Sequence, residues 1–177
     1  MILASRSPQR RAILEQLGIA FEVRPSDVEE LSVGDPYEVA LENARRKAAA
    51  VDGEFVLGVD TLVALGGRIY GKPGTEDEAL ATLSALSGRT HQVVSGLVLG
   101  DDGITVTTEV TFRDLDAAAL AWYVGTGEWQ GRAGGYAIQG AGAALVRGIR
   151  GDYLNVVGLP AAALLDLLPP GLHPMGG

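Results

Sequence analysis

The 177-residue sequence contains no cysteine, which excludes disulfide bonds, thiolate catalysis and zinc sites built on cysteine. No uncharged apolar run reaches about 18 residues, and the first residues do not form a basic and then apolar signal segment. We therefore expect a soluble, cytoplasmic protein that binds no membrane. The phosphate loop of ATPases, the dinucleotide fingerprint of dehydrogenases and the nucleophile elbow of serine hydrolases are absent as well.

Basic residues are scarce, and lysine is the scarcest of them. The chain has 14 Lys and Arg residues against 22 Asp and Glu residues, which gives a net charge of −8. Because a protein that coats DNA or RNA needs a basic face, we expect no nucleic-acid partner. Lys47 and Lys72 are the two lysines of the sequence, and their retention in an arginine-rich chain favours a functional role.

The apolar content predicts one domain with a sizeable core, since 47% of the residues are hydrophobic and 20% are charged. Mixed strand and helix patterns predict an α/β fold with a mixed sheet flanked by helices, over residues 1–168. A frayed tail is expected at 169–177, and a glycine-rich loop with one or two short strands at 125–151. Strands are expected at 1–4, 21–24, 55–65, 68–70, 91–99 and 104–113, with a strand end at 156–157. Helices are expected from Ser7-Pro8 onward and at 37–51, 75–86, 117–124 and 161–168.

The segment around Ser7-Pro8 is the first candidate for a functional site. Serine suits the N-cap and proline the first helical position, so a strand leads directly into a helix N-terminus. The free N–H groups and the positive dipole end there can bind a phosphate, and Arg6, Arg10 and Arg11 add positive charge. A capped surface helix with solvated arginines explains the same residues, and from this segment alone it is the favoured interpretation.

Asp60 is the second candidate, because it interrupts an otherwise apolar strand pattern at 57–65. A buried carboxylate is unfavourable unless it is paired, hydrogen-bonded or bound to a metal. Such a group can act as a general base or hold Mg²⁺, and Glu29-Glu30 in the preceding acidic loop could share that ion. A structural role explains Asp60 equally well, namely an acid at a strand end that pairs with a nearby arginine or with a helix terminus. For Glu29-Glu30, the spacing alone favours solvated loop side chains over a metal site.

The two lysines are the third candidate. Lys72 lies in a Gly-Lys-Pro-Gly segment, where the neighbouring glycine allows a ligand to approach the backbone. Lys47 ends the helical run Arg45-Arg46-Lys47, whose side chains point in different directions and cannot all face one ligand. His91 is too distant from His173 in the sequence to suggest a pair of metal ligands, and we expect it to make a structural hydrogen bond.

A series of short motifs, in order from about residue 2 to residue 165, resembles that of the Maf family. Members of that family are nucleoside triphosphate pyrophosphatases, once described as inhibitors of septum formation. The motifs are Ala4-Ser5-Arg6-Ser7-Pro8, Ala44-Arg45-Arg46-Lys47-Ala48, Gly58-Val59-Asp60-Thr61, Gly71-Lys72-Pro73, Leu86-Ser87-Gly88-Arg89-Thr90-His91, Ala133-Gly134-Gly135-Tyr136-Ala137-Ile138-Gln139-Gly140, Gly151-Asp152-Tyr153 and Val157-Gly158-Leu159-Pro160.

The resemblance implies an elongated, two-lobed α/β domain with a nucleotide cleft between the lobes, and a homodimer. It implies hydrolysis of a nucleoside triphosphate to the monophosphate and pyrophosphate with a divalent metal cation, Mg²⁺ or Mn²⁺. Asp60 corresponds to the family's proton acceptor, and Glu30 and Asp60 to its metal-binding acids. The further residues implied are catalytic Lys47 and Lys72 and substrate-binding Ser7, Gln9, Arg10, Thr61 and Gln139.

Three of these motifs indicate a pyrimidine substrate. Asp60-Thr61, Ile138-Gln139-Gly140 and Gly151-Asp152-Tyr153 resemble the versions found in members that act on dTTP and UTP, and modified pyrimidine nucleotides are further candidates. Gln9 departs from the arginine usual in those members and removes a cation from the loop. Two alternatives stay open: a broad-specificity house-cleaning pyrophosphatase, and a regulatory cell-division protein in which hydrolysis is incidental.

Overall fold

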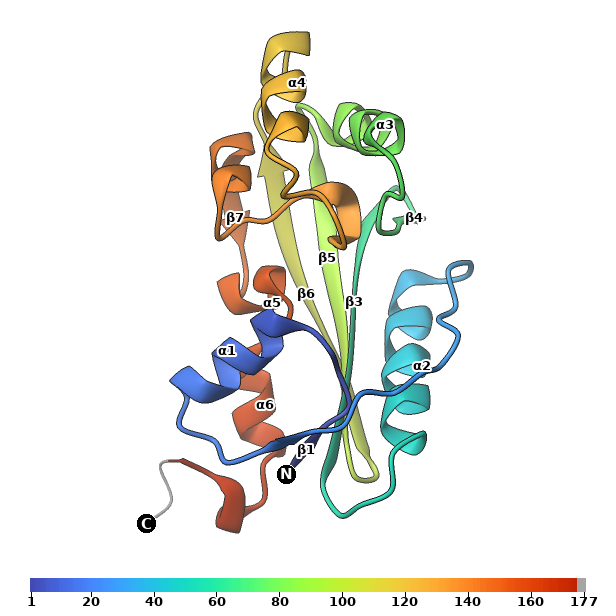
Figure 1. The fold of residues 1–177 in the computed structure, drawn as a ribbon, viewed down its shortest axis with the longest axis vertical. Coiled ribbons are helices and arrows are strands. Elements are labelled where there is room, and N and C mark those ends of the chain that lie inside the picture. Colours follow the sequence, from blue (N-terminus) through green and yellow to red (C-terminus); the bar gives the residue numbers. More distant parts are fainter. Residues whose placement is uncertain (175–177) are drawn as a thin grey trace.

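Three long antiparallel strands, β3 (Val56–Leu65), β5 (Thr90–Leu99) and β6 (Asp102–Phe112), run along the longest dimension of the protein (Figure 1). The computed structural model describes residues 1–174. Its seven-stranded sheet has the order β2-β1-β3-β5-β6-β7, with β4 (Arg68–Tyr70) paired to β3 and β7 (Val146–Arg150) at one edge. β1 (Ile2–Leu3) pairs in parallel with β2 (Glu22–Val23) and β3, whereas the other pairs are antiparallel. The sheet is therefore mixed, as predicted.

Helices cover both faces of this sheet, with α2 on one face and α1, α5 and α6 on the other (Figure 1). Within the part of the chain that the structure describes, no helix is long and apolar enough to cross a membrane. The helices are α1 (Pro8–Gln16), α2 (Pro36–Ala49), α3 (Glu76–Leu86), α4 (Ala117–Gly125), α5 (Tyr153–Val157) and α6 (Ala161–Leu167), and the 3₁₀ turns are η1 (Ala133–Gly135), η2 (Ala141–Leu145) and η3 (Pro170–Leu172).

Two glycines allow α2 to lie unusually close to the sheet. A Cβ atom on Gly58 would clash with the carbonyl oxygen of Ala44, and one on Gly96 would clash with that of Ala40. Asp60 pairs directly with Gly96 across the β3–β5 ladder. Because alternate strand residues share a face, Asp60 points toward α2 together with Gly58 and Gly96. A short side chain on this strand can therefore reach polar groups on the helix.

The opposite face of β3 contributes to two separate apolar clusters. Leu57 and Val59 pack with α1 and α6 in one of them. Val63 packs in the other, which contains side chains of α3, α4 and β6. Thr61 lies between these apolar residues on the same face of the strand. The sheet therefore has a polar position at the junction of its two cores.

One predicted element is wrong. Val156 and Val157, which were expected to end a strand, are the last residues of α5. The Asp152 carboxylate accepts hydrogen bonds from the backbone N–H groups of Leu154 and Asn155, which starts a helix, and Gly158 ends it. In the glycine-rich stretch, β7 is the one strand found. Of the predicted tail, Pro170–Leu172 form a 3₁₀ turn and 175–177 lie outside the described residues.

Candidate active site

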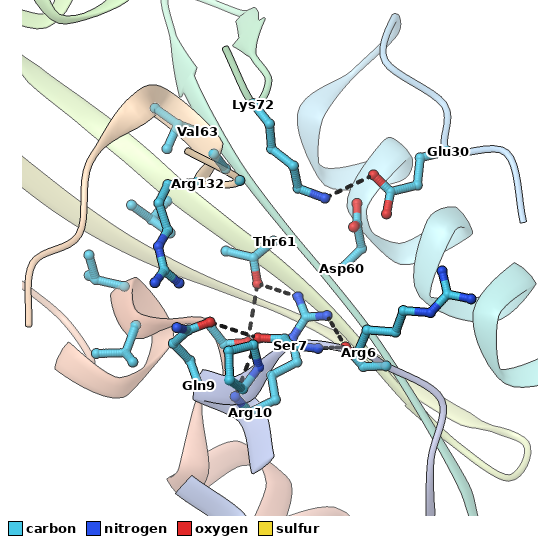
Figure 2. A pocket seen from close by; sticks show the side chains of 18 of the residues that line it. Arg6, Ser7, Gln9, Arg10, Glu30, Asp60, Thr61, Val63, Lys72 and Arg132 are labelled. Atoms are coloured by element: carbon cyan, nitrogen blue, oxygen red, sulfur yellow. Dashed lines mark hydrogen bonds and ion pairs between the residues drawn. The ribbon is translucent and has the colours of Figure 1, made fainter. Parts of the chain in front are cut away.

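A cavity of about 510 Å³ opens at the polar position between the two cores (Figure 2). Within the described part of the chain, its lining has five cationic side chains against two carboxylates, although the whole protein carries a net charge of −8. The cavity is therefore suited to an anionic ligand. All nine residues of the predicted site line it, namely Ser7, Gln9, Arg10, Glu30, Lys47, Asp60, Thr61, Lys72 and Gln139.

Asp60 is held by two side chains of α2. The Lys47 ammonium donates to Oδ1 of Asp60 over 2.6 Å, and the Asn43 amide donates to Oδ2 over 2.9 Å. Asp60 is 6% exposed and Lys47 8%, so the ion pair is almost fully withdrawn from solvent. Asn43 and Lys47 are four residues apart, which places them on the same face of the helix. The buried carboxylate thus has both oxygens hydrogen-bonded and still keeps lone pairs for a further donor.

Glu30 lies beside this pair at the end of the acidic loop. Its carboxylate accepts from Lys47 at 2.6 Å and lies 3.6 Å from the Lys72 ammonium. Asn43 also bonds both backbone groups of Leu31, which fixes the loop next to Asp60. Partial burial opposes ionisation of Glu30, but the hydrogen bond from Lys47 and the nearby cations outweigh it and hold the pKa of this carboxyl below its usual value.

The helix start predicted at Ser7-Pro8 lines the cavity. Ser7 is the N-cap of α1, and its hydroxyl oxygen accepts from the Arg10 backbone N–H. The same hydroxyl donates to the side-chain oxygen of Gln9 over 3.1 Å. Arg6 lines the cavity and pairs with Asp27. Arg11, which was considered with them, turns away and pairs with Glu15 on the exposed side of the helix.

Arg10 is fixed at the centre of the cavity by neutral acceptors. Its guanidinium donates to the Gly158 carbonyl at 2.9 Å, the Ser5 hydroxyl at 3.0 Å and the Thr61 hydroxyl at 3.2 Å. Burial lowers the pKa of Arg10, and the negative charges of Asp60 and Glu30 partly offset this effect. Arginine still stays protonated in proteins. Its positive charge is held in place without a directly bonded carboxylate, ready for an anionic ligand.

Two residues of the cavity region were not found from the sequence, Asn43 and Arg132. The spacing of Asn43 and Lys47 on one helix face could have indicated the first of them. Arg132 lies in the glycine-rich stretch, where no periodicity shows which side chains point inward. Its Nε is buried and has no hydrogen-bond partner among residues 1–174.

His91 does not line the cavity and makes the structural hydrogen bond that was expected of it. It is fully buried, and its Nε2 lies 2.9 Å from the hydroxyl of Tyr136, which lines the cavity. Its ring also contacts Phe112 edge-on at a centroid distance of 4.9 Å. Burial lowers the pKa of His91 to about 4, so the ring is neutral near pH 7.

The carboxylates can take part in metal binding as a pair. Glu30 and Asp60 come from different elements and converge on the Lys47 ammonium. Within residues 1–174, no cluster of three or more His, Cys, Asp and Glu side chains could hold a metal ion. Mg²⁺ is commonly bound by one or two carboxylates together with substrate phosphates. The donor set therefore fits a hard cation that binds jointly with a phosphorylated substrate.

Sequence comparisons place the chain among known proteins. The family description "Maf-like protein" matches residues 1–170. The protein named dTTP/UTP pyrophosphatase of Anaeromyxobacter dehalogenans strain 2CP-C is 47% identical over 178 residues, covering 95% of this chain and 92% of the relative. The protein of the same name from Thermococcus kodakarensis is 48% identical, with 94% of both chains covered. The one from Moorella thermoacetica is 45% identical, with 95% of this chain and 93% of the relative covered.

Proposed function

The chain belongs to the Maf family, and from this membership we propose that it hydrolyses dTTP and UTP to the nucleoside monophosphate and pyrophosphate. The observation that carries the proposal is the pairing of a buried, hydrogen-bonded carboxylate with an excess of positive charge in one cavity. The name shared by the relatives supplies the substrates.

Asp60 is the proposed proton acceptor. Water attacks the α-phosphorus, and its proton passes to a carboxylate oxygen of Asp60. The bond between the α-phosphorus and the oxygen that bridges it to the β-phosphorus then breaks, and pyrophosphate leaves. Lys47 and Asn43 hold the carboxylate in one orientation, which fixes the direction from which it can accept a proton. No covalent intermediate with the protein is required.

Arg10, Lys47 and Lys72 are the proposed partners of the phosphate oxygens. Negative charge accumulates on these oxygens as the α–β anhydride bond breaks, and cations already in place stabilise it without reorganisation. Arg10 meets this condition best, because three neutral hydrogen bonds hold its guanidinium. The N-terminal end of α1, capped by Ser7, adds the positive end of the helix dipole beside it.

Glu30 and Asp60 are the proposed ligands of a divalent cation, Mg²⁺ or Mn²⁺. Bound there with the substrate, the cation supplies positive charge beside the phosphates. The Lys47 ammonium contacts both carboxylates, and each carboxylate keeps lone pairs that Lys47 does not use. Removal of divalent cations with a chelator is therefore expected to abolish turnover.

Gln9, Thr61 and Gln139 are the proposed side chains for substrate recognition. The amides of Gln9 and Gln139 offer a donor and an acceptor each, whereas Thr61 also fixes Arg10. Gln9 stands where the resemblance leads us to expect arginine, and its side-chain oxygen accepts a hydrogen bond from the Ser7 hydroxyl instead of adding a further cation.

A nucleotide panel tests the proposed function. The purified protein is incubated with Mg²⁺ or Mn²⁺ and dTTP, UTP, CTP, the purine triphosphates, 7-methyl-GTP or pseudo-UTP, and pyrophosphate and orthophosphate are measured separately. We expect pyrophosphate, released chiefly from dTTP and UTP. Equal release from all nucleotides would support the broad house-cleaning alternative, and no release would refute the proposal. A homodimer is expected from the family resemblance, and light scattering checks it.

A further inference from the structure

Arg132 is a cavity residue whose position is fixed but whose side chain has no partner among residues 1–174. Its backbone N–H donates to the Trp129 carbonyl at 3.2 Å, and its carbonyl accepts from Gly135 at 3.0 Å. The next turn is tied to the loop that carries Lys72, because Gly134 donates to the Gly71 carbonyl at 3.0 Å. The side chain therefore enters the cavity from a segment anchored to the rest of the site (Figure 2).

The residues that the structure describes do not satisfy the guanidinium of Arg132. Its buried Nε has no hydrogen-bond partner in the part of the chain that the structure describes, and no carboxylate there forms an ion pair with this guanidinium. A buried donor on a charged group is unfavourable unless an acceptor reaches it. Arg10 contrasts with it, since each of its three guanidinium nitrogens donates one hydrogen bond to a protein group. The terminal N–H groups of Arg132 make no hydrogen bond with residues 1–174, so they are available to a substrate in the cavity.

Valine side chains line the part of the cavity that Arg132 enters. Val63 and Val93 face each other across β3 and β5, on the same face of the sheet as Thr61, and both line the cavity. Val156 and Val157 of α5 line it as well. In Figure 2, Arg132 and Val63 lie on one side of Thr61 and Arg10, whereas Glu30 and Lys72 lie on the other. An apolar wall beside a guanidinium suits a flat ring that carries carbonyl oxygens.

We propose that Arg132 recognises the base of the nucleotide by donating a hydrogen bond to the O4 keto oxygen of a uracil or thymine ring that rests against the valines. This inference rests on the proposed function and assigns a specificity role within it. A guanidinium has only donors, so it matches the O4 keto oxygen of uracil and thymine and not the ring N3–H beside it. Cytosine presents an amino group in place of O4, and two donors would then face each other. Arg132 thus selects keto pyrimidines against CTP.

The selectivity of Arg132 variants tests this inference. In R132A, kcat/KM for UTP and dTTP is expected to fall by about 10- to 100-fold, the range for one well-placed base contact. The value for CTP is expected to change much less, so that the ratio of UTP to CTP falls. R132K keeps the charge but loses the planar fork, and is expected to recover only part of the ratio. R11A removes one positive charge outside the cavity and is expected to leave the ratio unchanged.

Product inhibition separates base recognition from phosphate binding. R132A is expected to weaken inhibition by UMP and to leave inhibition by pyrophosphate unchanged, with the melting temperature of each variant measured as a fold control. Weaker inhibition by pyrophosphate, with equal losses for UTP and CTP, would overturn the inference. Calorimetry with UMP and CMP requires no turnover: wild-type protein that binds both equally would overturn the inference by itself. Failure of the wild type to release pyrophosphate would instead refute the proposed function.

Discussion

Two residues of α2 stabilise the buried charge of Asp60. Lys47 supplies the opposite charge and Asn43 supplies a neutral donor, each to a different carboxylate oxygen. Removing one member of a buried pair is destabilising, because it leaves the other charge uncompensated. Here Glu30 also contacts Lys47, so the ammonium keeps a partner when Asp60 is neutralised. This arrangement allows the proposed catalytic role of Asp60 to be tested without losing the fold.

Asp60→Asn is expected to lower kcat by about 100-fold or more, since a positioned general base typically contributes about 100- to 10,000-fold. The amide keeps the size of the side chain, and its oxygen can still accept from Lys47 or Asn43. The measurement is kcat for dTTP together with the melting temperature.

Asp101→Asn is the matched control, because Asp101 is exposed in the turn between β5 and β6. It is expected to turn over dTTP at the wild-type rate. A wild-type rate in Asp60→Asn as well would remove Asp60 from the mechanism.

At the scale of elements, the position of α2 determines the geometry of the site. The helix carries both Lys47 and Asn43, and its distance from the sheet depends on Gly58 and Gly96. A methyl group at Gly96 would meet the backbone of Ala40 and Leu41, which cannot move without shifting the helix. Stability and catalysis are therefore coupled at this contact.

Gly96→Ala is expected to destabilise the protein by about 1–3 kcal/mol, the usual range for an overpacked core. It is also expected to lower kcat by about 10-fold or more, because small displacements of catalytic groups are costly. Denaturant unfolding and steady-state kinetics check the two effects.

Gly125→Ala serves as the comparison, because a Cβ at this last residue of α4 meets nothing within 4 Å. Its stability and kcat are expected to match those of the wild type. A Gly96→Ala protein that also behaves like the wild type would show that α2 does not depend on this close approach.

Most elements could be predicted from the sequence, since their signals are local. The N-cap at Ser7, the apolar run of β3 and the turn before β4 each lie within a few residues. Val156 and Val157 were placed wrongly because β-branched residues favour strands, whereas the Asp152 cap and the packing of α5 against the sheet determine the helix.

The site could be predicted in part, because residue types and motifs identified nine side chains that meet in one cavity. Their partners could not be predicted, since each contact joins distant segments. Arg10 reaches the Gly158 carbonyl 148 residues away, and Asn43 joins the Leu31 backbone to Asp60. Arg132 lies in a segment whose path depends on tertiary hydrogen bonds such as that from Gly134 to Gly71.

The stability of the whole protein is expected to depend on pH because His91 is buried as a neutral ring. Its pKa is about 4 in the folded protein and 6.5 as the ordinary value, so the unfolded chain binds more protons between these limits. The contribution of His91 to the free energy of unfolding is therefore fully present above pH 6.5. It is lost as the pH falls toward 4, because the unfolded chain then binds a proton that the buried ring does not. At pH 5 the loss amounts to about 2 kcal/mol relative to pH 7.

Urea unfolding at pH 7 and pH 5 measures this loss. Both values lie above 4.5, the ordinary pKa of Glu30, whose lowered pKa confines its own contribution to more acidic conditions. His91→Gln keeps a polar group near the Tyr136 hydroxyl but does not titrate, and it is expected to lose less stability than the wild type between these two pH values. Equal losses in both proteins would contradict this assignment.

The central claim is that water attacks the α-phosphorus in the cavity around Asp60. Hydrolysis of dTTP in water labelled with ¹⁸O, followed by mass spectrometry of both products, tests it most directly. We predict that one labelled oxygen appears in dTMP and none in pyrophosphate. Label in pyrophosphate, or release of orthophosphate in its place, would contradict the claim, because attack would then occur at the β- or γ-phosphorus.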